Sequence, residues 1–209
     1  MEKEKVIAKH LLDIGAVVLR PHEPFTWASG WKSPIYCDNR KIISYPQVRD
    51  EVCRQFIEVI KIHYPNVSAI AGVATGAIVH AALVANEMQL PMSYVRPKPK
   101  EHGLGNQVEG VVEAGQQVVV IEDLISTGGS SLQAVQALRD KGVNVLGMIA
   151  IFSYQFPVAI QRFKDEDVQC QTLTSYNQVI TLAKESNLIK ESDLSILENW
   201  QQDPANFSS

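Results

Sequence analysis

The chain has 209 residues, of which 45% are hydrophobic and 20% are charged, and its 19 Lys and Arg face 23 Asp and Glu for a net charge of −4. This length suffices for a full hydrophobic core, and the negative balance argues against nucleic acid or an anionic membrane as a partner. No apolar run approaches the roughly 18 residues of a membrane span, the charged first residues lack the apolar segment of a signal peptide, and the cysteines form no CxxC pair, so we expect a reduced protein of the cytoplasm.

The N-terminal part of the chain predicts two helices separated by a hairpin. Apolar residues recur at helical spacing along 3–15. Two short strands around a Ser-Gly pair follow within residues 25–38. Pro46, which suits the first turn of a helix, begins a long helix that runs to about His63 with an apolar stripe on one face.

Beyond residue 63 the pattern changes to alternating strands and helices. Alternation of this kind predicts an α/β fold, in which a parallel sheet is flanked by helices and the ligand lies beyond the carboxyl ends of the strands. In chain order we expect a strand at 68–73, a helix at 76–88, a strand at 92–95, a loop at 96–113, a strand at 118–121, a helix at 130–141, a strand at 145–152, a helix, a strand near 168–173 and two terminal helices.

The sharpest functional pattern lies where the strand at 118–121 ends. Glu122 and Asp123 follow this apolar run, and a segment rich in Ser, Thr and Gly, 126–131, opens the next helix. Amides and hydroxyls at a helix start can hold a phosphate, and glycines let the backbone come close. Two carboxylates can accept hydrogen bonds from the hydroxyls of a ribose and favour positive charge on its ring carbon. The alternative is a helix that Ser and Thr merely cap, but the cost of two carboxylates there favours a sugar-phosphate site.

A basic loop follows the strand expected at 92–95. Arg96, Lys98, Lys100 and His102 fall within seven positions, and Glu101 alone opposes them. Prolines and glycines keep the segment extended and flexible. Such a loop can close over a polyanion such as diphosphate, which would offset the repulsion between the cations. A solvated surface loop would show the same charges, but together with the acidic strand end the pattern favours diphosphate.

Three segments of the chain resemble one enzyme family. Residues 118–131 resemble the phosphoribosyl-diphosphate (PRPP) signature of type I phosphoribosyltransferases. The Arg-x-Lys-x-Lys-x-His-Gly-x-Gly loop that begins at Arg96 resembles the flexible catalytic loop of orotate phosphoribosyltransferases. Phe25 to Tyr36 resemble the N-terminal hood segment that covers the base in that family. The resemblance runs from about residue 10 to residue 155 and therefore covers most of the chain.

The resemblance implies a type I phosphoribosyltransferase-like parallel sheet flanked by helices, with a small N-terminal hood. We accordingly divide the chain into a helix and hood subdomain, 1–45, and a core domain, 46–209, which the C-terminal helices complete. The implied reaction transfers the 5-phosphoribosyl group from PRPP to orotate and gives orotidine 5′-monophosphate and diphosphate, a step of pyrimidine synthesis. Mg²⁺ is the implied cofactor. The implied assembly is a homodimer in which the 96–106 loop reaches the active site of the neighbouring subunit.

The resemblance also assigns site residues. Ser126 matches a contact to orotate, and Lys32 and Tyr36 are further candidates for orotate binding, although Lys32 could simply be exposed and Tyr36 could be a packing aromatic. No protein ligand of Mg²⁺ is assigned, because this ion dehydrates reluctantly and is expected to be held mostly by substrate oxygens and water. The residues matched to catalysis are Lys100, His102, Glu122 and Asp123, and those matched to PRPP binding are Arg96, Lys100, His102, Glu122, Asp123, Leu124, Ile125, Ser126, Thr127, Gly128, Gly129 and Ser130.

The chain departs from the family pattern at the base site. Ala28 stands where many members carry Lys, and neither Ser153 nor Tyr154 is the Arg that often contacts orotate. These departures affect the orotate contacts more than the sugar and diphosphate contacts. Two alternatives remain open: a phosphoribosyltransferase for a purine, and a non-catalytic regulator of the same fold that senses PRPP and binds nucleic acid. The net charge of −4 counts against the regulator.

Overall fold

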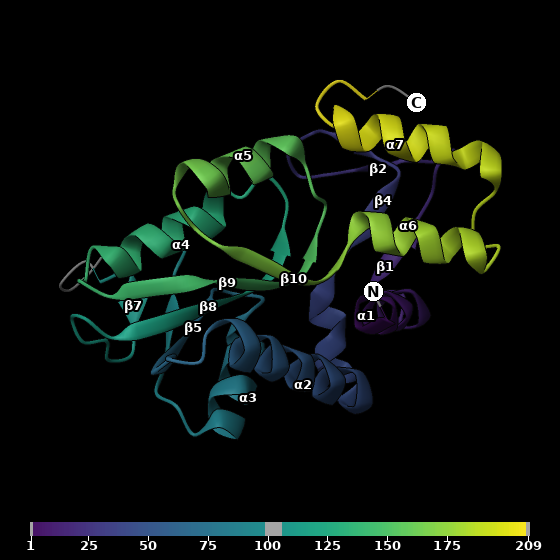
Figure 1. Ribbon diagram of the computed structural model, residues 1–209. Coiled ribbons are helices and arrows are strands. Elements are labelled where there is room, and N and C mark those ends of the chain that lie inside the picture. Colours follow the sequence, from purple (N-terminus) through teal and green to yellow (C-terminus); the bar gives the residue numbers. More distant parts are fainter. Residues whose placement is uncertain (1, 99–105, 208–209) are drawn as a thin grey trace.

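The computed structural model describes residues 2–98 and 106–207 of the chain. At its centre is a six-stranded sheet with helices on both faces (Figure 1). The predicted α/β fold is confirmed. Lys100 and His102, two of the residues matched to catalysis, lie outside the described residues with the rest of segment 99–105.

The sheet has the strand order β10-β9-β8-β5-β6-β7, and its strands run parallel except β7, which pairs antiparallel with β6. Residues 118–121 of β8 are fully buried, because helices cover both faces of the sheet. The pattern predicts a loop throughout 96–113, whereas the structure has the edge strand β7 there, which is too short to show any alternation. The strands are β5 (Ala69–Val73), β6 (Met92–Val95), β7 (Val108–Glu109), β8 (Gln117–Ile125), β9 (Asn144–Ser153) and β10 (Cys170–Ser175).

Helices α4 and α5 lie on one face of the sheet, and α2 and α3 lie on the other (Figure 1). α2 begins at Pro46, as predicted, and its apolar stripe is buried at Val48, Val52, Phe56 and Ile60. α1 packs against α6 and β10. Within the described part of the chain, no helix has the length and apolar character needed to cross a membrane. The helices are α1 (Glu2–Asp13), α2 (Pro46–His63), α3 (Ile78–Met88), α4 (Gly129–Arg139), α5 (Pro157–Asp165), α6 (Tyr176–Glu185) and α7 (Leu194–Gln202).

The hood segment forms two small antiparallel pairs, β1 (Val17–Leu19) with β4 (Ile35–Cys37) and β2 (Phe25–Thr26) with β3 (Lys32–Ser33). The C-terminal helix α7 anchors it: the indole N–H of Trp200 donates to the carbonyl of Lys32 at 3.0 Å. The Trp200 ring also meets Trp27 edge-on, with centroids 5.7 Å apart. Trp27 packs in turn on Tyr154, just after β9, at 5.1 Å. Aromatic contacts therefore fix the hood beside the carboxyl end of β9.

Candidate active site

Three loops meet at the carboxyl edge of the sheet, where β6, β5 and β8 are neighbours. The loop after β5 is tied to the end of β6 by a 2.9 Å hydrogen bond from the amide of Ala74 to the carbonyl of Val95. Arg96 follows directly, and β8 carries Glu122 and Asp123 toward the same edge. The structure thus brings the two predicted sugar-binding acids and the first residue of the predicted diphosphate loop to one edge of the sheet.

Glu122 is buried, although the sequence pattern places it at an open edge. β8 continues to Ile125, beyond the strand end predicted at residue 121, and only 4% of Glu122 is exposed. Its carboxylate accepts hydrogen bonds from the Ser131 hydroxyl at 2.7 Å and from the Asp123 amide at 3.0 Å. Burial, and then the adjoining Asp123 carboxyl, raise the pKa of Glu122 well above its ordinary value. The Ser131 hydroxyl, a candidate phosphate contact by sequence, is engaged with Glu122 instead.

Asp123 is held by two residues that the sequence pattern does not identify. The side-chain amide of Asn39, at the start of the short helix η1 (Asn39–Ser44), donates to the carbonyl of Asp123 at 2.6 Å. On the other side, the Asp123 carboxylate lies against Gly76 in the loop after β5, where a Cβ atom would overlap it. Asn39 is 84 residues away in the chain, so no local signal could reveal it. Gly76 lies in the short loop that follows the buried strand β5, and this position is the sequence signal for its role.

The segment from β8 into α4 presents backbone amides at this edge. Gly128 has a φ of 79°, a conformation that residues with a Cβ rarely adopt. The amide of Leu132 bonds back to the carbonyl of Gly128 at 3.0 Å, as the first regular bond of the helix. The amides before it have no partner within a helix of this geometry, and such free amides bind phosphate. The residues predicted to bind PRPP from Leu124 to Ser130 therefore run from the end of β8 through a short turn into the first residues of α4.

Arg96 is positioned by the edge strand β7. Its amide donates to the carbonyl of Gln107 at 2.9 Å, and its guanidinium lies 3.6 Å from a carboxylate oxygen of Glu109. Both side chains are partly exposed, and ion pairs of this kind contribute little to stability. A diphosphate with several negative charges can therefore replace Glu109 as the partner of Arg96.

The two hood candidates for orotate binding are both exposed. Lys32 donates from Nζ to the hydroxyl of Thr26 at 2.8 Å. Tyr36 is 41% exposed, and its ring touches that of Phe25 with centroids 5.6 Å apart. Part of the Tyr36 side chain is therefore open to a ligand. The roles of these residues and of Ser126 stay predictions.

His80 is a buried titratable group next to this site. It lies on α3, is 1% exposed, and neither ring nitrogen has a hydrogen-bond partner within the described residues. Its ring packs near Phe56 of α2, with centroids 6.4 Å apart. Loss of hydration lowers the pKa of His80 to about 4, with Asp123 acting in the opposite direction and Arg49 in the same direction. His80 is therefore neutral in the folded protein at pH 7.

We expect His80 to make stability depend on pH. Between its unfolded pKa of about 6.5 and its folded pKa of about 4, the unfolded chain binds a proton that the folded chain does not, so stability falls as pH falls. From pH 7 to pH 5, wild type should lose about 2 kcal/mol more free energy of unfolding than His80→Leu, by urea titration. His63→Leu, which removes an exposed imidazole, should keep the wild-type dependence. Equal slopes for wild type and His80→Leu would contradict the assignment.

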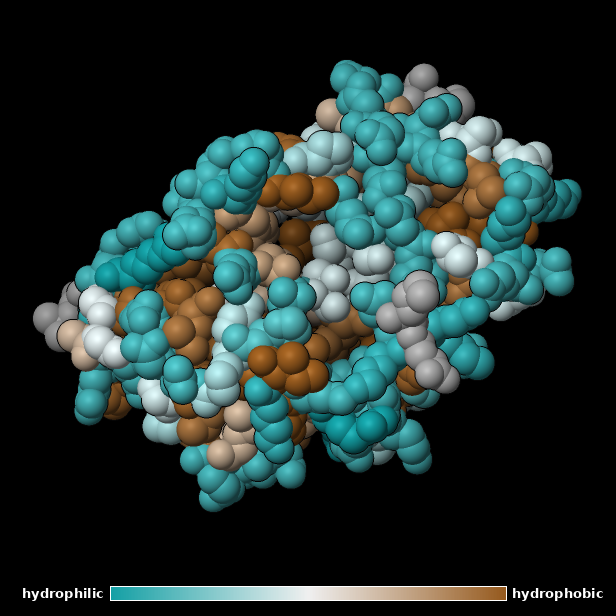
Figure 2. Space-filling model, in the orientation of Figure 1, coloured by the Kyte–Doolittle hydropathy of each residue, from teal (hydrophilic) through white to brown (hydrophobic). Residues whose placement is uncertain are grey.

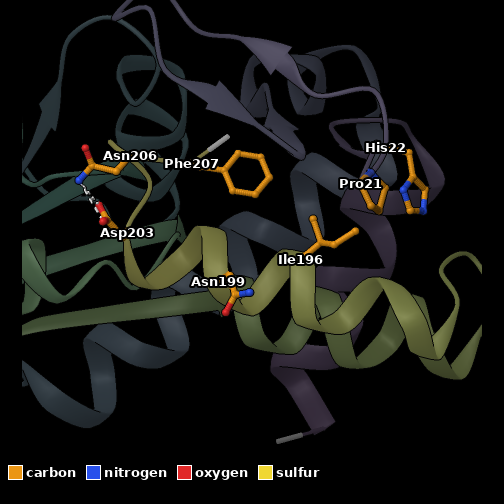
Figure 3. A pocket seen from close by; sticks show the side chains of 7 residues that line it. All are labelled: Pro21, His22, Ile196, Asn199, Asp203, Asn206 and Phe207. Carbon is orange, nitrogen blue, oxygen red and sulfur yellow. Dashed lines mark hydrogen bonds between the residues drawn. The ribbon is translucent and has the colours of Figure 1, made fainter. Parts of the chain in front are cut away.

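Two cavities lie away from the acidic pair. One of about 460 Å³ lies between α7, the chain after it and the Pro21–His22 turn, with Phe207 and Ile196 facing it (Figure 3). None of the predicted site residues lines it. The second, of about 340 Å³, lies between α5 and the ends of β8, β9 and β10, where Figure 2 shows apolar side chains in a hollow of the surface. Its lining includes Ile125 and Phe163 but neither Glu122 nor Asp123.

Comparison with known proteins first defines the class of the chain. The family described as "Phosphoribosyl transferase domain" matches residues 50–184, which include the strands β5 to β10, the acidic pair and the turn between β8 and α4. The sheet and the acidic edge are therefore those of a phosphoribosyltransferase.

Relatives that match along the whole chain narrow the class. An orotate phosphoribosyltransferase from Phocaeicola vulgatus is 53% identical over 99% of this chain and 97% of its own length, and one from Streptococcus agalactiae is 51% identical over the whole of both chains. The crystal structure of orotate phosphoribosyltransferase from Aeropyrum pernix superposes with a TM-score of 0.76 at 28% identity, over 88% of this chain and 99% of that one. A UMP synthase structure from Leishmania donovani has a TM-score of 0.79 at 28% identity, and the match covers 95% of this chain but 42% of that longer one. The chain belongs to the family of orotate phosphoribosyltransferases.

Proposed function

We propose that the protein transfers the 5-phosphoribosyl group of PRPP to orotate, which gives orotidine 5′-monophosphate and diphosphate. The observation that carries the proposal is the acidic pair at the end of β8, set directly before a turn of free amides. This arrangement suits a sugar that carries a phosphate at one end. The alternative purine specificity would share it, and the full-length similarity to orotate enzymes favours orotate.

The acidic pair is suited to a sugar that becomes positively charged. Asp123, which is half-buried, would accept hydrogen bonds from the ribose hydroxyls, while the enclosed Glu122 holds it through the backbone. As the bond to diphosphate breaks, positive charge grows on the ring carbon. Carboxylates in a site of low dielectric constant stabilise that charge more than water would. The N1 atom of orotate, which has lost its proton in the delocalised ring anion, then bonds to the same carbon, and the electrons of the broken C–O bond leave with diphosphate.

The leaving diphosphate requires positive charge on the opposite side. Arg96 is in place at the end of β6, and we assign Lys100 and His102 to the same role from the family pattern. Mg²⁺, when bound, would neutralise charge on the diphosphate. Within the described residues no group of three or more His, Cys, Asp or Glu side chains could hold a metal ion. We assign no protein ligand to Mg²⁺, because this ion dehydrates reluctantly and would take most of its ligands from PRPP and water. We also infer a cytoplasmic location, because all three cysteines are free thiols.

A panel of bases tests the proposed function. Purified protein with Mg²⁺ and PRPP is expected to consume orotate, which is measured as a fall in orotate absorbance, and to leave adenine and hypoxanthine unchanged. Turnover of a purine in place of orotate would favour the purine alternative. A protein that transfers phosphoribose to no base but binds RNA or DNA in a PRPP-dependent manner would favour the regulator.

We further propose a homodimer in which the loop acts in trans. Lys100→Ala and Asp123→Asn should each lose most activity, because one removes a cation from the loop and the other an acid from the sheet. Mixed after subunit exchange, the two variants should regain part of the activity, since one of the two sites in a hybrid dimer combines an intact loop with an intact acidic pair. Exchange can be verified with subunits of different mass. Confirmed hybrids without activity would indicate that each loop serves its own subunit.

A further inference from the structure

Helix α5 packs against residues 126–130, the segment that we assign to the 5′-phosphate and call the phosphate-binding turn. Nη1 of Arg162 donates to the carbonyl of Thr127 at 3.0 Å, and the same atom lies 3.6 Å from the position of a Cβ on Gly129. The ring of Phe163, the next residue of α5, lies 3.0 Å from the position of a Cβ on Gly128. Two consecutive residues of one helix thus contact three consecutive residues of the turn.

The contact to Thr127 sets the direction of an amide. In a trans peptide the carbonyl and the following N–H point in opposite directions. Because Arg162 draws the carbonyl of Thr127 toward α5, the N–H of Gly128 points away from α5. The turn has no basic residue of its own between Ser126 and Ser131. Arg162 therefore also supplies a positive charge beside a group of amides that is suited to a phosphate of about two negative charges.

We propose that Arg162 is a positioning residue for the 5′-phosphate of PRPP. The inference rests on the proposed function, because that phosphate is the ligand assigned to the turn. Arg162 acts through the backbone: it holds the peptide between Thr127 and Gly128 in the orientation that presents an N–H to the phosphate. Its guanidinium adds favourable electrostatic energy that a neutral side chain at this position would not provide.

Arg139 provides a matched control. It also joins α4 to α5, but at the opposite end of α4, where its guanidinium donates to the carbonyls of Glu166 at 3.0 Å and Asp167 at 3.2 Å. Both arginines are on the same pair of helices, and both bind backbone carbonyls on the surface of the protein. They differ in that Arg162 alone holds the phosphate-binding turn. A loss that arises from loosened packing of α4 on α5 would appear in both variants.

The test separates the two ends of PRPP. Ribose 5-phosphate carries only the phosphate assigned to the turn, and inorganic diphosphate carries only the leaving group. For Arg162→Ala we expect the KM for PRPP and the dissociation constant of ribose 5-phosphate to rise about tenfold, with kcat and diphosphate binding within about threefold of wild type. Arg162→Lys, which keeps the charge, should recover part of the loss, and Arg139→Ala should bind all three ligands as wild type does.

Binding is measured by calorimetry without a base, on variants whose folding is verified by circular dichroism. Unchanged affinity of Arg162→Ala for ribose 5-phosphate, or an equal loss in Arg139→Ala, would overturn the inference. An equal loss for diphosphate would overturn it as well. If Arg162→Ala does not fold, Arg162→Met, which keeps a long side chain without the donor or the charge, takes its place with the same expectations. A wild-type protein that binds PRPP but does not consume orotate would overturn the proposed function and leave the assignment of Arg162 standing.

Discussion

Replacing Gly76 by alanine should lower kcat by about 100-fold or more, because a misplacement of about 1 Å in a catalytic group has effects of this size. The Cβ atom would occupy the space of the Asp123 carboxylate, which lies directly on Gly76. Asp123 must then rotate away from the position that we propose for ribose binding. Steady-state kinetics with saturating PRPP and orotate measures the loss.

Two controls separate this effect from general damage to the sheet. Gly147→Ala places a Cβ against the ring of Tyr64, also within the core, but away from the acidic pair. It should lower the free energy of unfolding by about 1–3 kcal/mol, as overpacking does, with little effect on kcat of the folded protein. In an Asp123→Ala background the Gly76→Ala change should cost no stability, because the overlapping carboxylate is gone. A Gly76→Ala enzyme with normal kcat would contradict the placement of Asp123.

Replacing Glu122 by glutamine should lower turnover and raise stability together. Turnover should fall about 10²- to 10³-fold, the range found when a group that stabilises transition-state charge is removed. The free energy of unfolding should rise by about 1 kcal/mol at neutral pH. Burial of the ionisable Glu122 carboxyl costs free energy at this pH, and a glutamine, which carries no charge, avoids that cost. The two hydrogen bonds end on different carboxylate oxygens of Glu122, so the single oxygen of glutamine can keep the bond from the Asp123 amide, while its NH2 group can donate to the Ser131 hydroxyl.

The pH dependence gives this variant a specific signature. The pKa of Glu122 is raised in the folded protein. Above the ordinary Glu pKa of about 4.5, the folded chain therefore binds more protons than the unfolded chain. Stability then falls as the pH rises toward the pKa that Glu122 has in the folded protein. The advantage of Glu122→Gln should therefore be larger at pH 8 than at pH 5, by urea titration at both. Glu113→Gln, which changes an exposed carboxylate, should show neither effect. A destabilised Glu122→Gln protein would contradict the assigned burial.

The sequence predicted much of the fold because its periodic signals are local. The apolar stripe of α2 and its start at Pro46 follow from spacing along the chain alone, and so do the buried run of β8 and the alternation of strands and helices. The pattern failed where an element was short or its end depended on neighbours. β7 has only two residues, and β8 continues through Glu122 because β9 pairs with it as far as Ile125.

By itself the sequence predicted the class of the protein, through its resemblance to a known family, and it located the acidic pair and the Ser-, Thr- and Gly-rich segment after it, because those residues are adjacent in the chain. Tertiary structure decided how each acid is held. Asn39 and Gly76 reach Asp123 from other elements, Ser131 turns inward to Glu122, and Arg162 approaches the turn from α5. Contacts between segments many residues apart depend on how the elements pack, and no local pattern of residues records that packing.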